Sequence, residues 1–176
     1  EGAIKASWFE VSGDTHTGQS ITRAVALALA KFGTTNSETI LIKSGINTVD
    51  NSPIYTAIPP NKKLTIKGEV GNIIDFLCVE CFGAVFSNSA SWTYADSVYT
   101  HGHIVLDGLN FEGSRNPTSS YLSVNYGTRP ILYRNMQRVE VKNCSFKNIY
   151  GSALAVGVTG SVLIENNLST SVYGRQ

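Results

Sequence analysis

The sequence predicts an all-β chain, built as a parallel β-solenoid with one α-helix near its N-terminus. Three observations support this fold class: a strand phrase that repeats, a single segment with helical periodicity, and turn-forming residues between the phrases. The phrase reads apolar-x-apolar-charged followed by Gly or Asn, at residues 64–68, 104–108, 139–143 and 162–166. An earlier copy at residues 40–44 ends in Ser instead.

The spacing of the phrases fits stacked turns of chain. Successive copies begin 24, 40, 35 and 23 residues apart. A parallel solenoid requires such a basic step, because each turn lays its strand on the strand of the turn before and longer loops are pushed outward. We therefore expect residues 39–176 to form the solenoid, and residues 1–38 to form an N-terminal segment with a capping helix.

The helix is expected at residues 20–31. Four of its apolar side chains fall on one face, Ile21, Ala24, Val25 and Ala28. Thr17 or Ser20 can cap its N-terminus, and Gly33 with the polar residues after it ends it.

Each slot of the phrase has a predicted environment, because alternate residues of a strand face opposite ways. The first and third positions face inward. The charged fourth position faces outward, and its members form one column: Lys43, Lys67, Asp107, Lys142 and Glu165. The last position forms a corner with left-handed backbone, at Gly68, Gly108, Asn143 and Asn166. A second inward pair follows the corner, Leu109 with Phe111 and Cys144 with Phe146.

Composition restricts the partners. The 176 residues include 42% hydrophobic and 15% charged residues, with a formal net charge of +1. A balanced charge argues against nucleic acid and against an anionic membrane surface, which both need concentrated basic residues. No signal-peptide pattern opens the chain. No capping element follows the last phrase, so we expect further turns after Gln176 or a partner chain at this end.

The cysteines offer two interpretations. Cys78 and Cys81 have the spacing of a metal or redox pair, and His101 and His103 follow them. Two small buried cysteines in a hydrophobic run explain the same pattern, and the His-x-His spacing does not suit a helix-borne pair. We favour the second interpretation and expect no metal and no cofactor.

The N-terminal third resembles the pectate-lyase-like right-handed parallel β-helix proteins. The resemblance rests on residues 4–5, 8–9 and 13–20 running into an Ala-rich helix, followed by the strand phrases. It implies a right-handed, single-stranded parallel β-helix. In style the chain is most similar to bacteriophage tailspikes and capsular depolymerases. Such proteins are usually homotrimers of the virion tail that bind and cleave bacterial surface polysaccharide. The motifs mark the fold and contain no catalytic residue; Asp14 is interpreted as a turn residue.

Catalytic candidates come from the outward carboxylates. Hydrolysis of a polysaccharide needs two carboxylates beside the glycosidic bond, and elimination needs a base with a cation nearby. We select Asp107, Glu112 and Glu140 as catalytic candidates, with Arg115 to hold an acidic sugar. The alternative is that these charges belong to a surface ladder. His101 and His103, just before an inward phrase, are candidates for a base or a sugar ligand.

Sugar-binding candidates lie in two long insertions. Aromatic faces pack against sugar rings while their polar edges stay in water. The selected residues are Trp92, Tyr94, Tyr99, Tyr126 and Arg129. The insertions can instead anchor long loops or a trimer interface.

The sequence thus predicts part of a tailspike-type depolymerase located on a virion tail. Two alternatives remain open. One is a secreted bacterial polysaccharide lyase or hydrolase of the same fold, and the other is a non-catalytic trimerising or glycan-binding segment.

Overall fold

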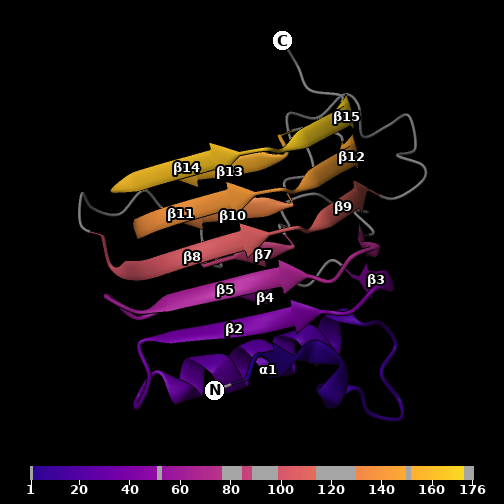
Figure 1. The fold of residues 1–176 in the computed structure, drawn as a ribbon, viewed down its shortest axis with the longest axis horizontal. Coiled ribbons are helices and arrows are strands. Elements are labelled where there is room, and N and C mark those ends of the chain that lie inside the picture. Colours follow the sequence, from indigo (N-terminus) through magenta and orange to yellow (C-terminus); the bar gives the residue numbers. More distant parts are fainter. Residues whose placement is uncertain are drawn as a thin grey trace.

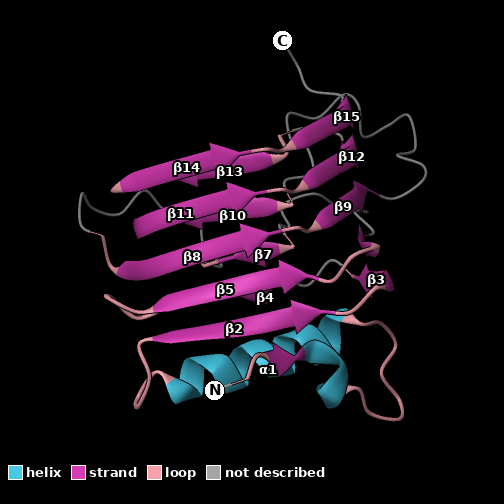
Figure 2. Cartoon of the chain, viewed as in Figure 1, coloured by secondary structure: helices cyan, strands magenta, loops and turns pink. Residues whose placement is uncertain are grey.

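The chain forms three parallel β-sheets and one α-helix around a shared core (Figures 1 and 2). The computed structural model describes residues 2–50, 53–76, 85–88, 99–113, 130–149 and 152–172. The helix is α1 (Gly18–Lys31), and a short 3-10 helix, η1 (Ala6–Phe9), precedes it.

The strands divide among the sheets as follows. The six-stranded sheet contains β1 (Ile4–Lys5), β2 (Ser37–Ile42), β5 (Lys63–Gly68), β8 (His101–Asp107), β11 (Met136–Lys142) and β14 (Ser161–Glu165), in that order. The five-stranded sheet contains β3 (Gly45–Val49), β6 (Asn72–Phe76), β9 (Asn110–Gly113), β12 (Ser145–Ile149) and β15 (Leu168–Val172). The four-stranded sheet contains β4 (Ile54–Tyr55), β7 (Phe86–Ser87), β10 (Ile131–Arg134) and β13 (Leu154–Gly157). From β2 to β15 the chain enters the three sheets in rotation, and all neighbours within a sheet are parallel.

The fold class predicted from the sequence, an all-β right-handed single-stranded parallel β-helix, is wrong. The described residues form three parallel sheets of four to six strands stacked with one helix, which is an α/β arrangement. The repeated phrase revealed only the strands of the six-stranded sheet and the inward pair of the next. The four-stranded sheet was missed because its strands are only two to four residues long and share no common phrase.

Helix α1 is part of the core. Its predicted apolar face is buried, with Ile21, Ala24 and Ala28 at 0% exposure and Val25 at 2%. The helix begins at Gly18, two residues before the predicted start, with Thr17 at the N-cap. The Thr17 side chain makes no capping hydrogen bond; instead, the Ser20 hydroxyl donates to the Thr17 carbonyl at 2.8 Å.

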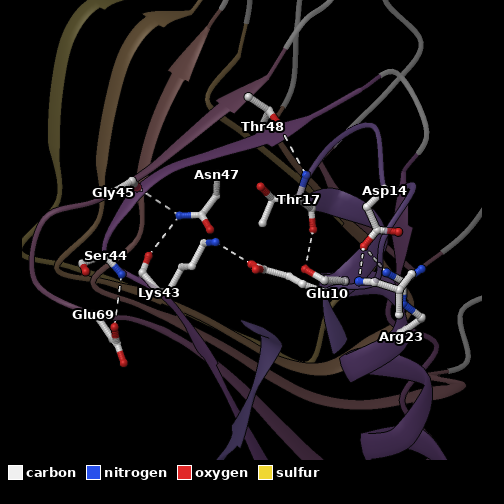
Figure 3. A network of polar contacts seen from close by, with 12 residues as sticks. Glu10, Asp14, Thr17, Arg23, Lys43, Ser44, Gly45, Asn47, Thr48 and Glu69 are labelled. Atoms are coloured by element: carbon white, nitrogen blue, oxygen red, sulfur yellow. Dashed lines mark hydrogen bonds and ion pairs between the residues drawn. The ribbon is translucent and has the colours of Figure 1, made fainter. Parts of the chain in front are cut away.

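A polar network joins the N-terminal segment to the sheets (Figure 3). Asp14 accepts hydrogen bonds from the Val11 backbone N–H at 3.1 Å and from Arg23, as its interpretation as a turn residue requires. The bond from Val11 and the neighbouring Arg23 hold the pKa of Asp14 below its ordinary value despite partial desolvation. Lys43 pairs with Glu10 here, across 33 positions of sequence. Lys43 lies between β2 and β3, and the Thr17 backbone N–H donates to Thr48 Oγ1 of β3 at 3.4 Å, so the network attaches the N-terminal segment to the start of the sheets.

The inward slots are confirmed for the phrases of β5, β8 and β11, whereas those of the last phrase, Val162 and Ile164, are 46% and 60% exposed. In register across β5, β8 and β11, the side chains of Leu64, Ile104 and Val139 are 0% exposed. The earliest copy is displaced by two residues, because Ile40 pairs with Ile66. Lys43 therefore lies outside the outward column, in which Leu41 takes the place beside Lys67.

The corner positions need Gly or Asn for two different physical reasons. Gly108, Asn143 and Asn166 have left-handed backbone, with φ of 66°, 53° and 53°. Gly68 does not, but a Cβ atom there would lie 2.3 Å from the Gly108 carbonyl oxygen. Glycine at position 68 thus serves close packing of successive corners.

Candidate functional site

The outer face of β5, β8 and β11 gathers charged side chains around one buried carboxylate. We call this surface the outer face; it presents three columns of side chains two residues apart along each strand. The first column contains Lys63, His103 and Arg138. The second contains Thr65, Val105 and Glu140, and the third contains Lys67, Asp107 and Lys142.

Glu140 is the centre of the outer face. Its Oε1 atom lies 2.7 Å from Arg138 Nε and 3.1 Å from His103 Nε2, and its Oε2 atom lies 2.9 Å from Lys142 Nζ. The residue is only 7% exposed. A carboxylate at this depth requires such partners, because an unpaired buried charge is costly.

The charge state of Glu140 follows from these contacts. Burial by itself raises the pKa of a carboxyl group, but the hydrogen bond and charge of Lys142 outweigh it, with help from Arg138. The pKa of Glu140 therefore lies below its ordinary value, and the side chain is ionised at neutral pH. An ionised carboxylate can orient a neighbouring group or accept a proton, but it cannot act as a general acid.

His103 is the best-placed proton acceptor on the outer face. Burial lowers its pKa, and the charges of Lys63 and Arg138 lower it further, which outweighs the opposite effect of Glu140. The ring is therefore neutral at pH 7. Its Nε2 atom is shielded from solvent and faces Glu140 Oε1.

This placement selects one tautomer of the ring. The negative charge of Glu140, 3.1 Å from Nε2, favours a proton on that nitrogen and leaves the lone pair on Nδ1, although the contact does not have hydrogen-bond geometry. No contact given for the described residues involves Nδ1, whereas Nε2 is buried without a hydrogen bond. A carboxylate that holds one ring nitrogen while the other is available as a base is a recurrent arrangement in catalysis.

Two cations flank the ring. Lys63 and Arg138 are the neighbours of His103 on β5 and β11, and adjacent strands lie about 4.8 Å apart. Arg138 binds Glu140 through Nε, and its side chain is 48% exposed. A ligand carboxylate resting over His103 would meet positive charge on both sides.

Asp107 lies at the edge of the same face. It accepts a hydrogen bond from Asn143 Nδ2 at 2.8 Å and lies 4.0 Å from Lys67 Nζ. Lys142 occupies the adjacent position between Asp107 and Glu165 in the column, and binds Glu140. These contacts are therefore compatible with both interpretations of Asp107 and Glu140, as members of a surface charge ladder and as catalytic residues.

Glu112 is placed elsewhere. It lies on β9 in the five-stranded sheet, where Lys147 Nζ contacts its Oε1 atom at 3.1 Å. Its register partner on β6 is Asp75, so two carboxylates occupy adjacent strands of this sheet. The structure brings together Asp107 and Glu140 among the predicted catalytic residues, and separates Glu112 from them.

The remaining predicted residues are mostly outside the described part of the chain. Tyr99 is described and is 46% exposed. Five sugar-binding candidates lie outside the described residues: Trp92, Tyr94, Arg115, Tyr126 and Arg129. Cys78 and Cys81 lie there too, and within the described ranges no group of three or more His, Cys, Asp or Glu side chains is placed to hold a metal ion.

Sequence reasoning did not select Lys63, and it did not group His103 with Arg138. A signal was present, since each of the three residues directly precedes the first inward residue of its phrase. Aligning that slot across the copies would have placed the three side chains in one column.

The two lowered pKa values predict how stability depends on pH. The unfolded chain binds a proton at His103 near its ordinary value of 6.5 and at Glu140 near 4.5, whereas the folded chain binds each only at lower pH. Stability should therefore fall as the pH decreases through 6.5 and again through 4.5. Urea unfolding measured from pH 7 to pH 4 checks this.

A Glu140→Gln variant isolates the second effect. We expect it to be less stable than the parent chain at pH 7, and the difference should shrink as the pH decreases below 4.5. A difference that stays constant across this range would contradict a lowered pKa at Glu140.

No helix in the described part of the chain has both the length and the apolar character needed to cross a membrane.

Comparison with known proteins gives a likeness in structure only. No protein-family model and no curated protein matches the sequence. A crystal structure from Parabacteroides merdae, described as that of a "putative glycosyl hydrolase", matches with a TM-score of 0.62. The match covers 97% of this chain and 79% of that chain, at 13% sequence identity. At this identity the likeness shows that the two chains share a fold.

Proposed function

We propose that this chain binds and cleaves an acidic polysaccharide on the outer face of the six-stranded sheet, as part of a depolymerase of bacterial capsular or O-antigen polysaccharide. The observation that carries the proposal is His103, neutral and held by Glu140, between the cations Lys63 and Arg138. This combination of base and flanking positive charge suits cleavage by elimination at a uronate sugar.

The reaction needs a base and a stabilised anion. His103 Nδ1 accepts the proton from the carbon that bears the uronate carboxylate, and the electrons of that C–H bond become negative charge on the carboxylate. Lys63 and Arg138 stabilise this charge. A carbon–carbon double bond then forms as the glycosidic C–O bond breaks, and the leaving oxygen takes a proton from water.

Hydrolysis by Asp107 and Glu140 is less well supported. A glycosidase needs one carboxylic acid that is protonated at the working pH, and such acids have raised pKa values. The pKa of Glu140 is lowered, and both of its oxygens are engaged by basic side chains. In the proposal Glu140 is a positioning residue that holds the His103 ring.

Hydrolysis at the five-stranded sheet is a second candidate. Asp75 and Glu112 are register partners on adjacent strands whose backbones lie about 4.8 Å apart, so the two carboxylates share one face of this sheet. A retaining glycosidase uses two carboxylates on one site, about 5 Å apart. The description of the P. merdae chain as a "putative glycosyl hydrolase" supports the same chemistry.

The setting of this activity rests on the sequence resemblance alone. We propose a homotrimeric tailspike on a virion tail, with a secreted bacterial enzyme as the alternative. Neither setting changes the chemistry assigned to the outer face.

The test is incubation of the chain with acidic capsular polysaccharides, and with neutral ones as a control, measuring reducing ends and the absorbance of unsaturated uronates. Both signals together, on acidic polymers only, are the expected result. New reducing ends without unsaturated uronates would indicate hydrolysis, and would favour Asp75 and Glu112 as the site. A chain that binds a polysaccharide but forms neither product would be a glycan-binding module. A chain that neither binds nor cleaves any of these polysaccharides would contradict the proposal.

A further inference from the structure

Four uncharged residues form an exposed strip where strands of the six-stranded sheet begin, at the left of Figure 1. They are Asn61, Tyr99, Gln137 and Gly160, and each lies within two residues of the first residue of β5, β8, β11 and β14, respectively. We call them the uncharged strip. Tyr99 is 46% exposed, Asn61 and Gly160 are exposed, and Gln137 is half-buried. The strip is therefore accessible to a ligand.

The Tyr99 ring lies against a glycine that brings two turns of chain close together. A Cβ atom on Gly160 would lie 3.7 Å from Tyr99 Cε2 and only 2.7 Å from the Gln137 carbonyl oxygen. The Gly160 backbone N–H donates to the Met136 carbonyl at 3.0 Å, which holds the glycine in this position. The ring is thus supported at one edge, while much of its surface faces solvent.

Two amide side chains continue the strip beyond the ring. Gln137 Nε2 donates to Asn61 Oδ1 at 3.1 Å, and the Asn61 backbone N–H donates to Gln137 Oε1 at 2.8 Å. Because β8 lies between β5 and β11 in the sheet, this pair reaches across the start of β8. The mutual bonds fix both amide groups. Each amide has two N–H bonds and an oxygen with two lone pairs, so both retain hydrogen-bonding capacity for a ligand.

The uncharged strip adjoins the cations of the outer face. Gln137 directly precedes Arg138, and Asn61 lies two residues before Lys63. Two residues of a strand extend about 7 Å, which is comparable to the length of one sugar unit. A sugar next to one that is held over His103 would therefore reach the strip.

The ionisable side chains around the strip supply little positive charge to it. Lys62 is turned away, because its Nζ atom donates to the Thr35 carbonyl and to Asn36 Oδ1, at 2.8 Å each. Burial lowers the pKa of His101, so this ring is neutral at pH 7. Arg138 binds Glu140 through Nε at 2.7 Å. The strip thus differs in charge from the neighbouring column of Lys63, His103 and Arg138.

We propose that the uncharged strip binds a neutral sugar next to the uronate, so that the preferred substrate is a polysaccharide in which uronates alternate with neutral sugars. The inference rests on the proposed function, which places the uronate over His103 between Lys63 and Arg138.

Both parts of the strip suit a neutral sugar. The ring of Tyr99 covers the apolar face of a sugar ring, and the amides of Asn61 and Gln137 donate to and accept from its hydroxyl groups. A homopolyuronate would bring a second carboxylate to the strip. That carboxylate would lose water without gaining a cation, which is unfavourable.

A Gln137→Lys variant tests the specificity. The probes are hyaluronan and unsulfated chondroitin, in which glucuronate alternates with an N-acetylated neutral sugar, and the homopolyuronates polygalacturonate and polymannuronate. The added lysine removes an amide and introduces a positive charge. The Kd should therefore rise about threefold for the alternating polymers and fall about threefold for the homopolyuronates. Isothermal titration calorimetry measures both, and a gain in affinity for one class cannot arise from misfolding.

Variants of Tyr99 test the ring itself. Tyr99→Ala should raise the Kd for the alternating polymers about five- to tenfold, whereas Tyr99→Phe keeps the ring and should stay within about twofold of the parent chain. Tyr55→Ala is the matched control, because Tyr55 is 44% exposed but lies on β4 of the four-stranded sheet. It should leave the Kd unchanged. Urea unfolding of each variant measures any separate effect on stability.

The outcomes separate this inference from the proposed function. If Tyr99→Ala binds the alternating polymers as tightly as the parent chain, or Gln137→Lys weakens both classes equally, the inference is overturned, although cleavage of acidic polymers by the parent chain would still support the proposed function. If the parent chain binds these polymers but cleaves none, the proposed reaction fails, and the effects at Tyr99 and Gln137 still decide the inference. A parent chain that binds neither class, or prefers the homopolyuronates, would also overturn it.

Discussion

Replacing His103 by Gln is expected to lower the rate constant of polysaccharide cleavage by about 10²- to 10⁴-fold, the range that general base catalysis contributes. Glutamine keeps a polar group beside Glu140 but cannot accept the proton. Because Lys63 and Arg138 remain, KM should change little. Steady-state kinetics on a uronate polymer that the parent chain cleaves measure both constants.

The pH profile distinguishes a base from a structural histidine. The pKa of His103 is lowered by burial and by Lys63 and Arg138, so the rising limb of the rate should lie below pH 6.5. In the His103→Gln variant this limb should disappear. His101→Gln is the matched control, because His101 lies on the same strand and burial also lowers its pKa. If the His103→Gln variant cleaved the polysaccharide as fast as the parent chain, the elimination mechanism would be wrong.

Replacing Phe111 by Ala is expected to destabilise the chain by about 3–5 kcal/mol, which is typical of a buried phenylalanine. Phe111 is 1% exposed and stacks on Phe146 with ring centroids 5.3 Å apart. It also meets the edge of Phe86, on the four-stranded sheet, at 6.2 Å. Removing the ring therefore leaves a cavity between two sheets. Urea unfolding measures the loss.

The control for Phe111 lies on the same sheet. Ile46 on β3 is 57% exposed, and Ile46→Ala should change stability by about 0.5 kcal/mol or less. If the two variants lost similar stability, the contact between the sheets would not contribute as the structure indicates.

Strand environments were predictable because they depend on local alternation. The inward positions of the phrases at residues 64–68, 104–108 and 139–143, the second inward pair of Leu109 and Phe111, and the left-handed corners at Asn143 and Asn166 all follow the sequence prediction. The buried face of α1 does too. Each of these depends on the chemistry of a residue and its immediate neighbours.

The register of the first copy was wrong because local pattern does not determine it. Shifting β2 by two residues keeps the same side chains inward, so alternation alone cannot distinguish the two alignments. The actual alignment places Ile40 beside Ile66, and with it removes Lys43 from the outward column and pairs it with Glu10.

The candidate site was predicted in part for a similar reason. Glu140 and Asp107 were selected as outward carboxylates, and they do share the outer face. Glu112 follows Asp107 by only five residues, but the corner at Gly108 turns the chain into a different sheet. The short separation of Asp107 and Glu112 in the sequence therefore wrongly suggested that they lie close together in space. The predicted roles of these carboxylates, the homotrimer and the polysaccharide partner stay predictions.

The sequence alone determined the strands of the repeated phrase, the buried faces of β5, β8 and β11, the corners at Gly108, Asn143 and Asn166, and the helix, because alternation and turn chemistry are local. Only the tertiary structure decided that three sheets and a helix share one core. It also decided that His103 lies between Lys63 and Arg138, residues 40 and 35 positions away. Such contacts depend on loop lengths and on packing across the whole chain, and with burial they lower the pKa of His103, whereas the pKa of Glu140 is lowered mainly by Lys142 on its own strand.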